Sequence, residues 1–180
     1  MRTNYYTRIL CSVLLSFALL CTFPLRADAA QWRVLKIVDG DSIIVSGIRS
    51  SGAPSRREEV RLIGIDAPEI RQAPWGRKAR RHLRRLMQIN GAAVRLEFDV
   101  EQRDRYGRLL AYGWTKNNVL LNERMVANGY ALAYTVPPNV KYAKRLAAAQ
   151  KKARFRRAGL WKSHAFSTSP RQWRQEHPRF

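Results

Sequence analysis

Short apolar runs separated by turn residues occupy the chain from Trp32 to Thr115. Runs of about four to eight residues rich in β-branched and aromatic side chains, bounded by Gly, Asp and Asn, are typical of strands. We predict five strands, over Trp32–Val38, Ser42–Val45, Val60–Ile65, Val94–Phe98 and Leu109–Thr115. Turns are expected at Asp39-Gly40, across the polar stretch Gly47–Arg57, and at Tyr106-Gly107. Five short strands linked in this way favour a small closed or nearly closed barrel.

Apolar positions three and four residues apart replace this alternation in three other segments. Ala79, Leu83 and Met87 define one face of a helix whose other face is rich in arginine, inserted between the third and fourth strands. Two further helices are predicted over Leu121–Asn128 and Lys141–Ala158, each followed by a helix-ending glycine. The predicted fold class is therefore α+β: a five-stranded barrel with one inserted and two appended helices.

The first residues have the pattern of a secretory signal peptide. Arg2 and Arg8 precede an apolar run from Ile9 to Phe23, and Ala27 and Ala29 give an A-x-A cleavage pattern. The apolar run is too short to cross a bilayer comfortably, which disfavours the alternative of a retained membrane anchor. We expect residues 1–29 to be removed on export, to the periplasm or outside the cell, with no stable membrane anchor afterwards.

The mature chain is expected to be one domain of 30–161 followed by a basic tail, 162–180. Both cysteines, Cys11 and Cys21, lie in the predicted signal peptide, so the mature protein is expected to contain no disulfide. We expect a monomer.

The chain is strongly basic, with 34 Lys and Arg against 13 Asp and Glu. Removing residues 1–29 takes away three arginines and one aspartate, which leaves 31 basic and 12 acidic residues and a net charge of +19. A field of this size attracts polyanions, so nucleic acid is the first candidate partner and an anionic membrane surface the second. A role in solubility alone is the remaining alternative.

Four of the few acidic residues, Asp39, Asp41, Asp66 and Glu69, lie beside the ends of predicted strands. Each has an ordinary explanation, because Asp-Gly is common in hairpin turns and a proline turn follows Asp66. Carboxylates brought together repel, however, and a cation between them relieves the repulsion. Oxygen ligands of this kind suit calcium or magnesium, and the histidines have no spacing for a zinc site.

Two arginines accompany these acids. Arg61 stands inside an apolar strand, where a guanidinium group is costly unless it reaches an acidic partner or a phosphate. Arg108 closes the turn Asp104–Arg108. Two fixed guanidinium groups can hold a phosphodiester and stabilise the additional charge of its transition state.

Three segments together resemble the three motifs of the staphylococcal nuclease (thermonuclease) family. They are Val38-Asp39-Gly40-Asp41-Ser42, Val60-Arg61-Leu62-Ile63-Gly64-Ile65-Asp66-Ala67-Pro68-Glu69 and Asp104-Arg105-Tyr106-Gly107-Arg108-Leu109-Leu110-Ala111-Tyr112. They occur in the family's order, and with Gly159-Leu160-Trp161 the resemblance covers residues 32–161.

The resemblance implies an OB-fold barrel and a calcium-dependent endonuclease that cleaves DNA and RNA and leaves 3′-phosphate ends. It implies that Asp41, Asp66 and the backbone carbonyl of Ala67 bind one Ca²⁺ ion, which polarises the phosphate. Glu69 would be the general base, with Arg61 and Arg108 on the phosphate. Arg105, Tyr106 and Tyr134 would contact the nucleotide.

Two other functions fit parts of the sequence. OB barrels also bind single-stranded nucleic acid without cutting it, through basic grooves and aromatic stacking. A pure binder gains nothing from Asp41 and Glu69 facing a polyanion, so the complete set of acids and arginines favours the nuclease. A membrane-active cationic protein would need a helix with large apolar residues, and the alanine-rich stripe of Lys141–Ala158 does not supply one.

Overall fold

The structure is a computed structural model that describes residues 31–48, 54–162 and 168–178. The predicted signal peptide, 1–29, lies outside the described residues. Within the part of the chain that is described, no helix is long and apolar enough to cross a membrane.

Five strands close into a barrel, as the apolar alternation predicts. They are β1 (Gln31–Ile37), β2 (Ser42–Ile48), β3 (Pro54–Leu62), β5 (Ala93–Arg103) and β6 (Leu109–Trp114). The order around the barrel is β1-β2-β3-β6-β5, and β1 pairs with β5 to complete the circle. Every pair is antiparallel except β3 with β6, which run parallel with Arg61 opposite Leu110. The barrel and the inserted and appended helices confirm the predicted α+β class and its OB-type architecture.

Several predicted strand boundaries are wrong, and the fourth strand runs to Arg103 rather than ending at Phe98. The third strand ends at Leu62 rather than Ile65, because Gly64 turns the chain with a φ of +76°. Ile65–Asp66 then forms a separate short strand, β4, which pairs with β7 (Leu132–Ala133). Both ends of the stretch Gly47–Arg57, predicted as a loop, are strand, since β2 continues to Ile48 and β3 begins at Pro54, while 49–53 lie outside the described residues.

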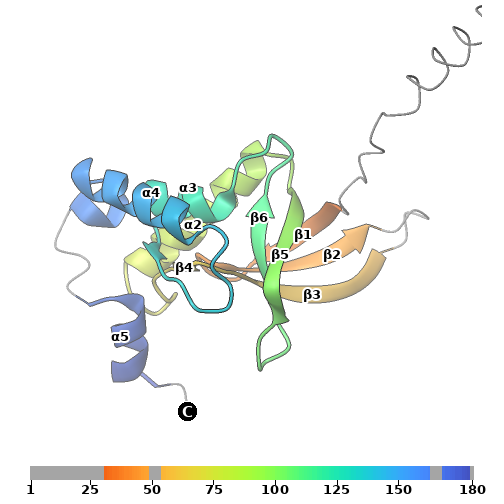
Figure 1. The fold of residues 1–180 in the computed structure, drawn as a ribbon, viewed down its shortest axis with the longest axis horizontal. Helices are drawn as coiled ribbons and strands as arrows, with labels where there is room; N and C mark the ends of the chain where they lie inside the picture. The colour runs from red at the N-terminus through yellow and green to blue at the C-terminus, as the bar shows by residue number, and fades with distance from the viewer. Residues whose placement is uncertain (1–30, 49–53, 163–167, 179–180) are drawn as a thin grey trace, which may run out of the picture.

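The three predicted helices are present as α2 (Trp75–Ile89), α3 (Leu121–Ala127) and α4 (Ala143–Phe155). A 3₁₀ turn, η1 (Gly159–Lys162), follows α4. One helix has no counterpart in the prediction: α5 (Pro170–Glu176) forms in the basic tail. In Figure 1 the barrel strands and helices α2 to α4 form two adjacent parts of the molecule, and α5 lies apart from the other helices.

The core joins the barrel to the helices. Ile43, Val45, Val60 and Leu62 are fully buried in β2 and β3. The helices contribute to the same cluster through Leu83 and Met87 of α2, Leu121 and Met125 of α3, and Leu146 of α4. Burial of a large aliphatic side chain contributes roughly 1.5–3 kcal/mol. The ends of β1, β3 and β4 are therefore held on a rigid base, and the candidate chemistry lies there.

Candidate active site

The turn between β1 and β2 presents Asp41 to the barrel end. Gly40 permits this, because a Cβ there would lie 2.6 Å from the Cβ of Ala67 and 2.8 Å from that of Ala79. The Asp41 N–H donates to Asp39 Oδ1 at 2.9 Å, so Asp39 braces the turn. Burial raises the pKa of Asp39, and the nearby Arg61 charge opposes that shift. The Asp-Gly-Asp sequence thus forms a turn packed on the core with its second carboxylate buried.

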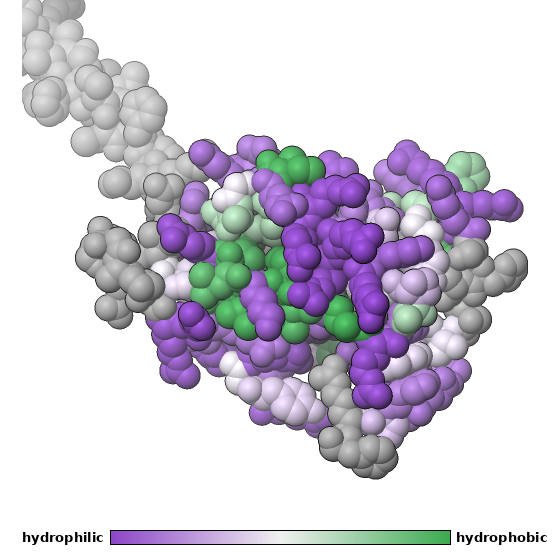
Figure 2. Space-filling model, turned by 180° about the vertical axis from the view of Figure 1, so that it is seen from behind, coloured by the Kyte–Doolittle hydropathy of each residue, from purple (hydrophilic) through white to green (hydrophobic). Residues whose placement is uncertain are grey.

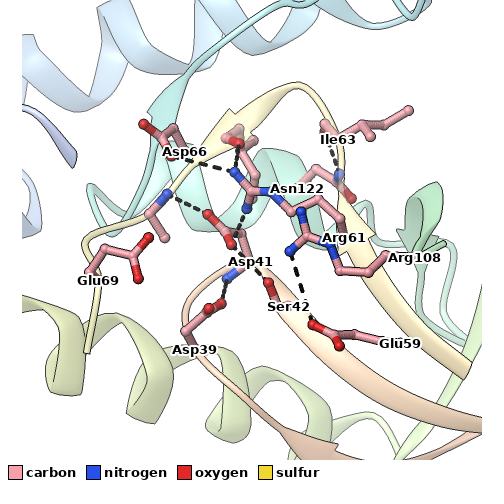
Figure 3. Close-up of polar contacts among 12 residues, drawn as sticks. Asp39, Asp41, Ser42, Glu59, Arg61, Ile63, Asp66, Glu69, Arg108 and Asn122 are labelled. Carbon is pink, nitrogen blue, oxygen red and sulfur yellow. Dashed lines mark hydrogen bonds and ion pairs between the residues drawn. The ribbon is translucent and has the colours of Figure 1, made fainter. Parts of the chain in front are cut away.

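Arg61 lies between Asp41 and Asp66. It forms an ion pair with Asp41, a weaker contact of 3.4 Å from Nη2 to Asp66 Oδ1, and a hydrogen bond of 3.2 Å from Nη2 to the Ile65 carbonyl. Both carboxylates are almost fully buried, at 5% and 2% exposed. Burial lowers the pKa of Arg61, while Asp66 and Asp39 act to raise it. Figure 3 shows the Arg61 side chain directed into this group of acids.

The turn between β3 and β4 brings Asp66 to the same side of the chain as Arg61. Strict alternation along one strand would separate positions 61 and 66, but the turn at Gly64 ends β3 before that parity applies. The next residue joins the same cluster, because the Ala67 N–H donates to Asp41 Oδ2 at 2.6 Å. Asp41, Arg61, Asp66 and the Ala67 backbone therefore form one connected group.

Glu69 follows on the loop to α2, with its side chain close to this group (Figure 3). Two backbone turns fix the loop: Gln72 N–H donates to the Glu69 carbonyl at 2.8 Å, and Gly76 N–H to the Gln72 carbonyl at 3.0 Å. A Cβ on Gly76 would lie 1.8 Å from the Glu69 carbonyl oxygen, so only glycine allows α2 to start this close. The Glu69 carboxylate is thus placed by the start of α2.

Arg108 approaches from the β5–β6 hairpin. Asp104 holds it, accepting hydrogen bonds of 3.0 Å from the Arg108 N–H and 2.8 Å from Nε. Arg108 Nη1 also lies 4.0 Å from Glu59 Oε1. Its charge lowers the pKa of Arg61, so the two guanidinium groups lie within electrostatic range of each other. A bound anion between them would relieve that repulsion.

Comparison with known proteins assigns this group of residues to a family. The family model described as "Staphylococcal nuclease homologue" matches residues 59–163. The chain is similar to the thermonuclease of Staphylococcus hyicus, at 34% identity over 140 residues that cover 75% of this chain and 78% of that protein. The chain belongs to the staphylococcal nuclease family.

Other relatives agree with this assignment. The thermonuclease of Staphylococcus intermedius is 34% identical over 136 residues, covering 73% of this chain and 76% of its own. Endonuclease YncB of Bacillus subtilis (strain 168) is 29% identical over 143 residues, covering 74% of this chain and 63% of its own. As a member of the staphylococcal nuclease family with such relatives, the protein is a nuclease.

The three residues predicted to contact the nucleotide lie at two places in this nuclease. Arg105 and Tyr106 are exposed at the tip of the β5–β6 hairpin, where Arg105 Nη2 donates to the Tyr106 hydroxyl at 2.7 Å. Tyr134 follows β7, and its N–H donates to the Gly64 carbonyl at 2.9 Å, beside the turn that orients Asp66. Tyr134 therefore lies near Asp66. Arg105 and Tyr106 lie on the same hairpin as Arg108.

Sequence reasoning missed two residues that shape the site. Arg174 of α5 donates from Nη2 to both Asp66 oxygens at 2.9 and 3.0 Å, and from Nη1 to Glu69 Oε1 at 3.1 Å. Asn122 of α3 is fully buried and donates to the Ile63 carbonyl at 2.7 Å, fixing the chain just before Gly64. Asn122 sits at the start of a predicted helix, where a polar residue is ordinary, and Arg174 is one of three arginines in the basic tail. Neither position carried a local signal.

The donor set of this nuclease has the chemistry of a site for a hard divalent cation. Asp41 and Asp66 are buried carboxylates, which require a countercharge, and the Ala67 peptide lies beside them. In the described residues the acids are paired with guanidinium groups, and no three His, Cys, Asp or Glu side chains are gathered as a metal cluster. The two carboxylates supply the hard oxygen donors that such an ion requires, and their present partners are Arg61 on Asp41 and Asp66, and Arg174 on Asp66.

Proposed function

We propose that this nuclease is an exported, calcium-dependent endonuclease that hydrolyses phosphodiester bonds of DNA and RNA and leaves 3′-phosphate ends. The observation that carries the proposal is the buried Arg61 bridge between Asp41 and Asp66, with Glu69 beside it, in a member of a nuclease family. Buried charge of this kind is costly to maintain and is typical of sites that act on charged substrates. We further propose that it acts as a monomer, in the periplasm or outside the cell.

Each side chain has a role in the proposed mechanism. Asp41, Asp66 and the Ala67 carbonyl would hold the Ca²⁺ ion, which supplies Lewis-acid stabilisation of phosphate charge when bound. Glu69 accepts the proton of the attacking water. Arg61 and Arg108 donate hydrogen bonds to the phosphate oxygens, where negative charge accumulates as the nucleophile adds.

The remaining groups orient the substrate. Arg105 and Tyr106 are exposed on the same hairpin as Arg108, so they can contact the nucleotide whose phosphate Arg108 holds. Tyr134 supplies an aromatic surface next to the Gly64 turn, and stacking of a base on such a ring contributes about 1–3 kcal/mol. Asp104 is a positioning residue, because it fixes the Arg108 side chain. The bond broken is the one to the 5′ oxygen.

We expect purified protein to degrade single- and double-stranded DNA and RNA with Ca²⁺, and to lose that activity in excess chelator. The metal-binding carboxylates repel one another without a cation, which is why removal of Ca²⁺ is expected to have a large effect. Hydrolysis is followed by gel, and product ends are tested by polymerase extension before and after phosphatase treatment. Binding without hydrolysis would identify a single-strand-binding protein instead. Full activity in chelator would remove the carboxylate metal site, and products that extend without phosphatase would contradict 3′-phosphate ends.

A further inference from the structure

A basic hollow lies along the exposed face of α2, outside the candidate active site. Its volume is about 360 Å³, and it is lined by Trp75, Lys78, Arg81, His82, Arg85, Tyr130, Gly159 and Lys162. Four of these residues are Lys or Arg and none is acidic. A concave surface with four cations and no countercharge of its own favours an anionic ligand.

The helix arranges these side chains in a line. Trp75, Lys78, Arg81 with His82, and Arg85 follow one another at three- and four-residue spacing, on a face that flanks the buried Ala79, Leu83 and Met87. Lys78 Nζ lies 4.2 Å from the centre of the Trp75 ring. Successive cations on one helical face lie about 5–6 Å apart, which suits the repeated phosphates of an extended strand.

The opposite wall is rigid. Tyr130 stacks on His82 at 4.2 Å with an interplanar angle of 17°, and His82 Nε2 lies 2.9 Å from Asn128 Nδ2. Gly159 adopts a φ of +54°, and a Cβ there would lie 2.5 Å from the carbonyl oxygens of Asn128 and Gly129. Burial, and secondarily the charge of Arg85, lower the pKa of His82 to about 4, so His82 is neutral at pH 7. The positive charge of the hollow therefore comes from its Lys and Arg side chains.

The hollow is connected to the active site through the backbone. Glu69 and Trp75 are joined by two hydrogen-bonded turns, through the Gln72 N–H at 2.8 Å and the Gln72 carbonyl at 3.0 Å. The face seen in Figure 2 is largely hydrophilic around an apolar area. Trp75, at the start of α2, thus lies only two turns of backbone from Glu69.

We propose that this hollow is an accessory binding site for the phosphodiester backbone of a nucleic-acid strand, with Trp75 available to stack a base. The proposal rests on the proposed function only in the choice of nucleic acid as the polyanion. Sites that combine a basic groove with an aromatic ring bind single strands without base specificity. Such a site retains a long substrate next to the catalytic residues.

The test compares two variants of equal charge. K78Q/R81Q/R85Q removes three cations from the hollow, and K144Q/K151Q/K152Q removes three exposed cations from α4. Binding of a fluorescent 20-nucleotide strand, in excess chelator so that it stays intact, is measured by anisotropy over a range of salt. We expect the α2 variant to lose at least about 10-fold in affinity and to reduce the salt slope by about 2, as three lost phosphate contacts imply. We expect a clearly smaller loss for the α4 variant.

Equal losses in the two variants would overturn the site and leave only general charge attraction. If the α2 variant still binds the strand but no longer binds anionic phospholipid vesicles, the proposal is overturned and the hollow binds a membrane surface instead. Inorganic phosphate that competes as well as a strand does would show a site for a single anion, which also contradicts the proposal. Hydrolysis of a dinucleotide, measured on the unmodified chain, separates the binding site from the proposed nuclease activity. If the unmodified chain cleaves nothing but the α2 variant still loses strand affinity, the binding site is supported and the proposed hydrolysis is contradicted.

A second, independent observation concerns Arg174. Its guanidinium joins Asp66 and Glu69 with three contacts of 2.9 to 3.1 Å. The tail is anchored at other points as well: Pro170 is buried, and Gln72 Nε2 donates to the Thr168 carbonyl at 3.0 Å. Ser169 begins α5 by accepting from the Gln172 N–H at 3.2 Å. The tail thus brings a fixed positive charge to the acids of the site.

We infer that Arg174 is an internal cation that competes with the divalent ion for Asp66 and at the same time occupies the carboxylate of the general base Glu69, so that α5 restrains the nuclease until metal binds. This inference depends on the proposed metal site. The guanidinium and the ion both need the Asp66 oxygens, so binding of the ion disfavours the contact that Arg174 makes there. Arg174 is a regulatory residue in this account, and it takes no part in the reaction.

Calcium titration by calorimetry tests the competition without measuring activity. We expect R174Q to bind Ca²⁺ at least about 10-fold more tightly than the unmodified chain, the size expected from one charge-assisted contact. R171Q, a change of an exposed arginine on the same helix, is expected to leave the affinity unchanged. In the unmodified chain, amide hydrogen exchange in 173–176 should accelerate on adding Ca²⁺. Equal Ca²⁺ affinities in R174Q and the unmodified chain would overturn the competition alone, whereas absence of Ca²⁺ binding in both would overturn the metal site itself.

Discussion

Glu69→Gln is expected to lower the rate of DNA hydrolysis by about 10²- to 10⁴-fold, because the amide cannot accept the proton of the attacking water. The change keeps the size of the side chain and one oxygen able to accept from Arg174, whose Nη1 lies 3.1 Å from Glu69 Oε1. The fold should therefore persist. The measurement is the single-turnover rate with saturating Ca²⁺, together with the thermal midpoint of each protein.

Glu123→Gln is the matched control for that experiment. This substitution also removes a carboxylate that pairs with an arginine, because Glu123 Oε2 lies 2.6 Å from Arg145 Nη2. Glu123 lies on α3, however, and takes no part in the proposed chemistry. We expect its hydrolysis rate to stay within about 2-fold of the unmodified enzyme, as for a surface ion pair of small energetic value. Unchanged turnover in Glu69→Gln would remove Glu69 from the mechanism.

The barrel could be predicted because each strand carries its own signal. Ile43, Val45, Val60 and Leu62 alternate along β2 and β3 and are all buried, so these core positions can be recognised from the sequence of each strand alone. The pairing of β4 with β7 was not predictable in the same way. Each strand has only two residues, and their pairing depends on distant parts of the fold.

The candidate site was predictable in its motifs and not in its counter-ions. Asp41 and Arg61 come together because β2 and β3 pair in the barrel, and the turn at Gly64 brings Asp66 to them. Arg174 lies 108 residues from Asp66 along the chain and is one of many arginines in a basic protein. No periodicity distinguishes it, since its contact depends on where the whole tail docks. Long-range charge pairing of this kind is set by the finished fold.

Arg61→Ala is expected to damage both stability and activity. It leaves Asp41 and Asp66 buried, at 5% and 2% exposed, with one positive partner fewer, and removing one member of a buried pair costs about 3–5 kcal/mol. Loss of a donor to the developing phosphate charge costs a further 10²- to 10³-fold, roughly, in rate. Chemical denaturation gives the stability, and the rate is measured on the folded fraction.

Arg61→Lys separates the two effects, because it keeps the charge and removes the planar fork. An ammonium group can neutralise one buried carboxylate but cannot span Asp41 and Asp66 together, or grip a phosphate with two parallel hydrogen bonds. We therefore expect most of the stability to return while the rate stays low. Arg103→Ala, which breaks an exposed pair of 3.1 Å with Glu58, should leave the stability almost unchanged. Full activity in Arg61→Lys would mean that Arg61 serves the phosphate only as a point charge. Equal stability of the unmodified chain and the three variants would show that Arg61 does not hold the two buried acids in place.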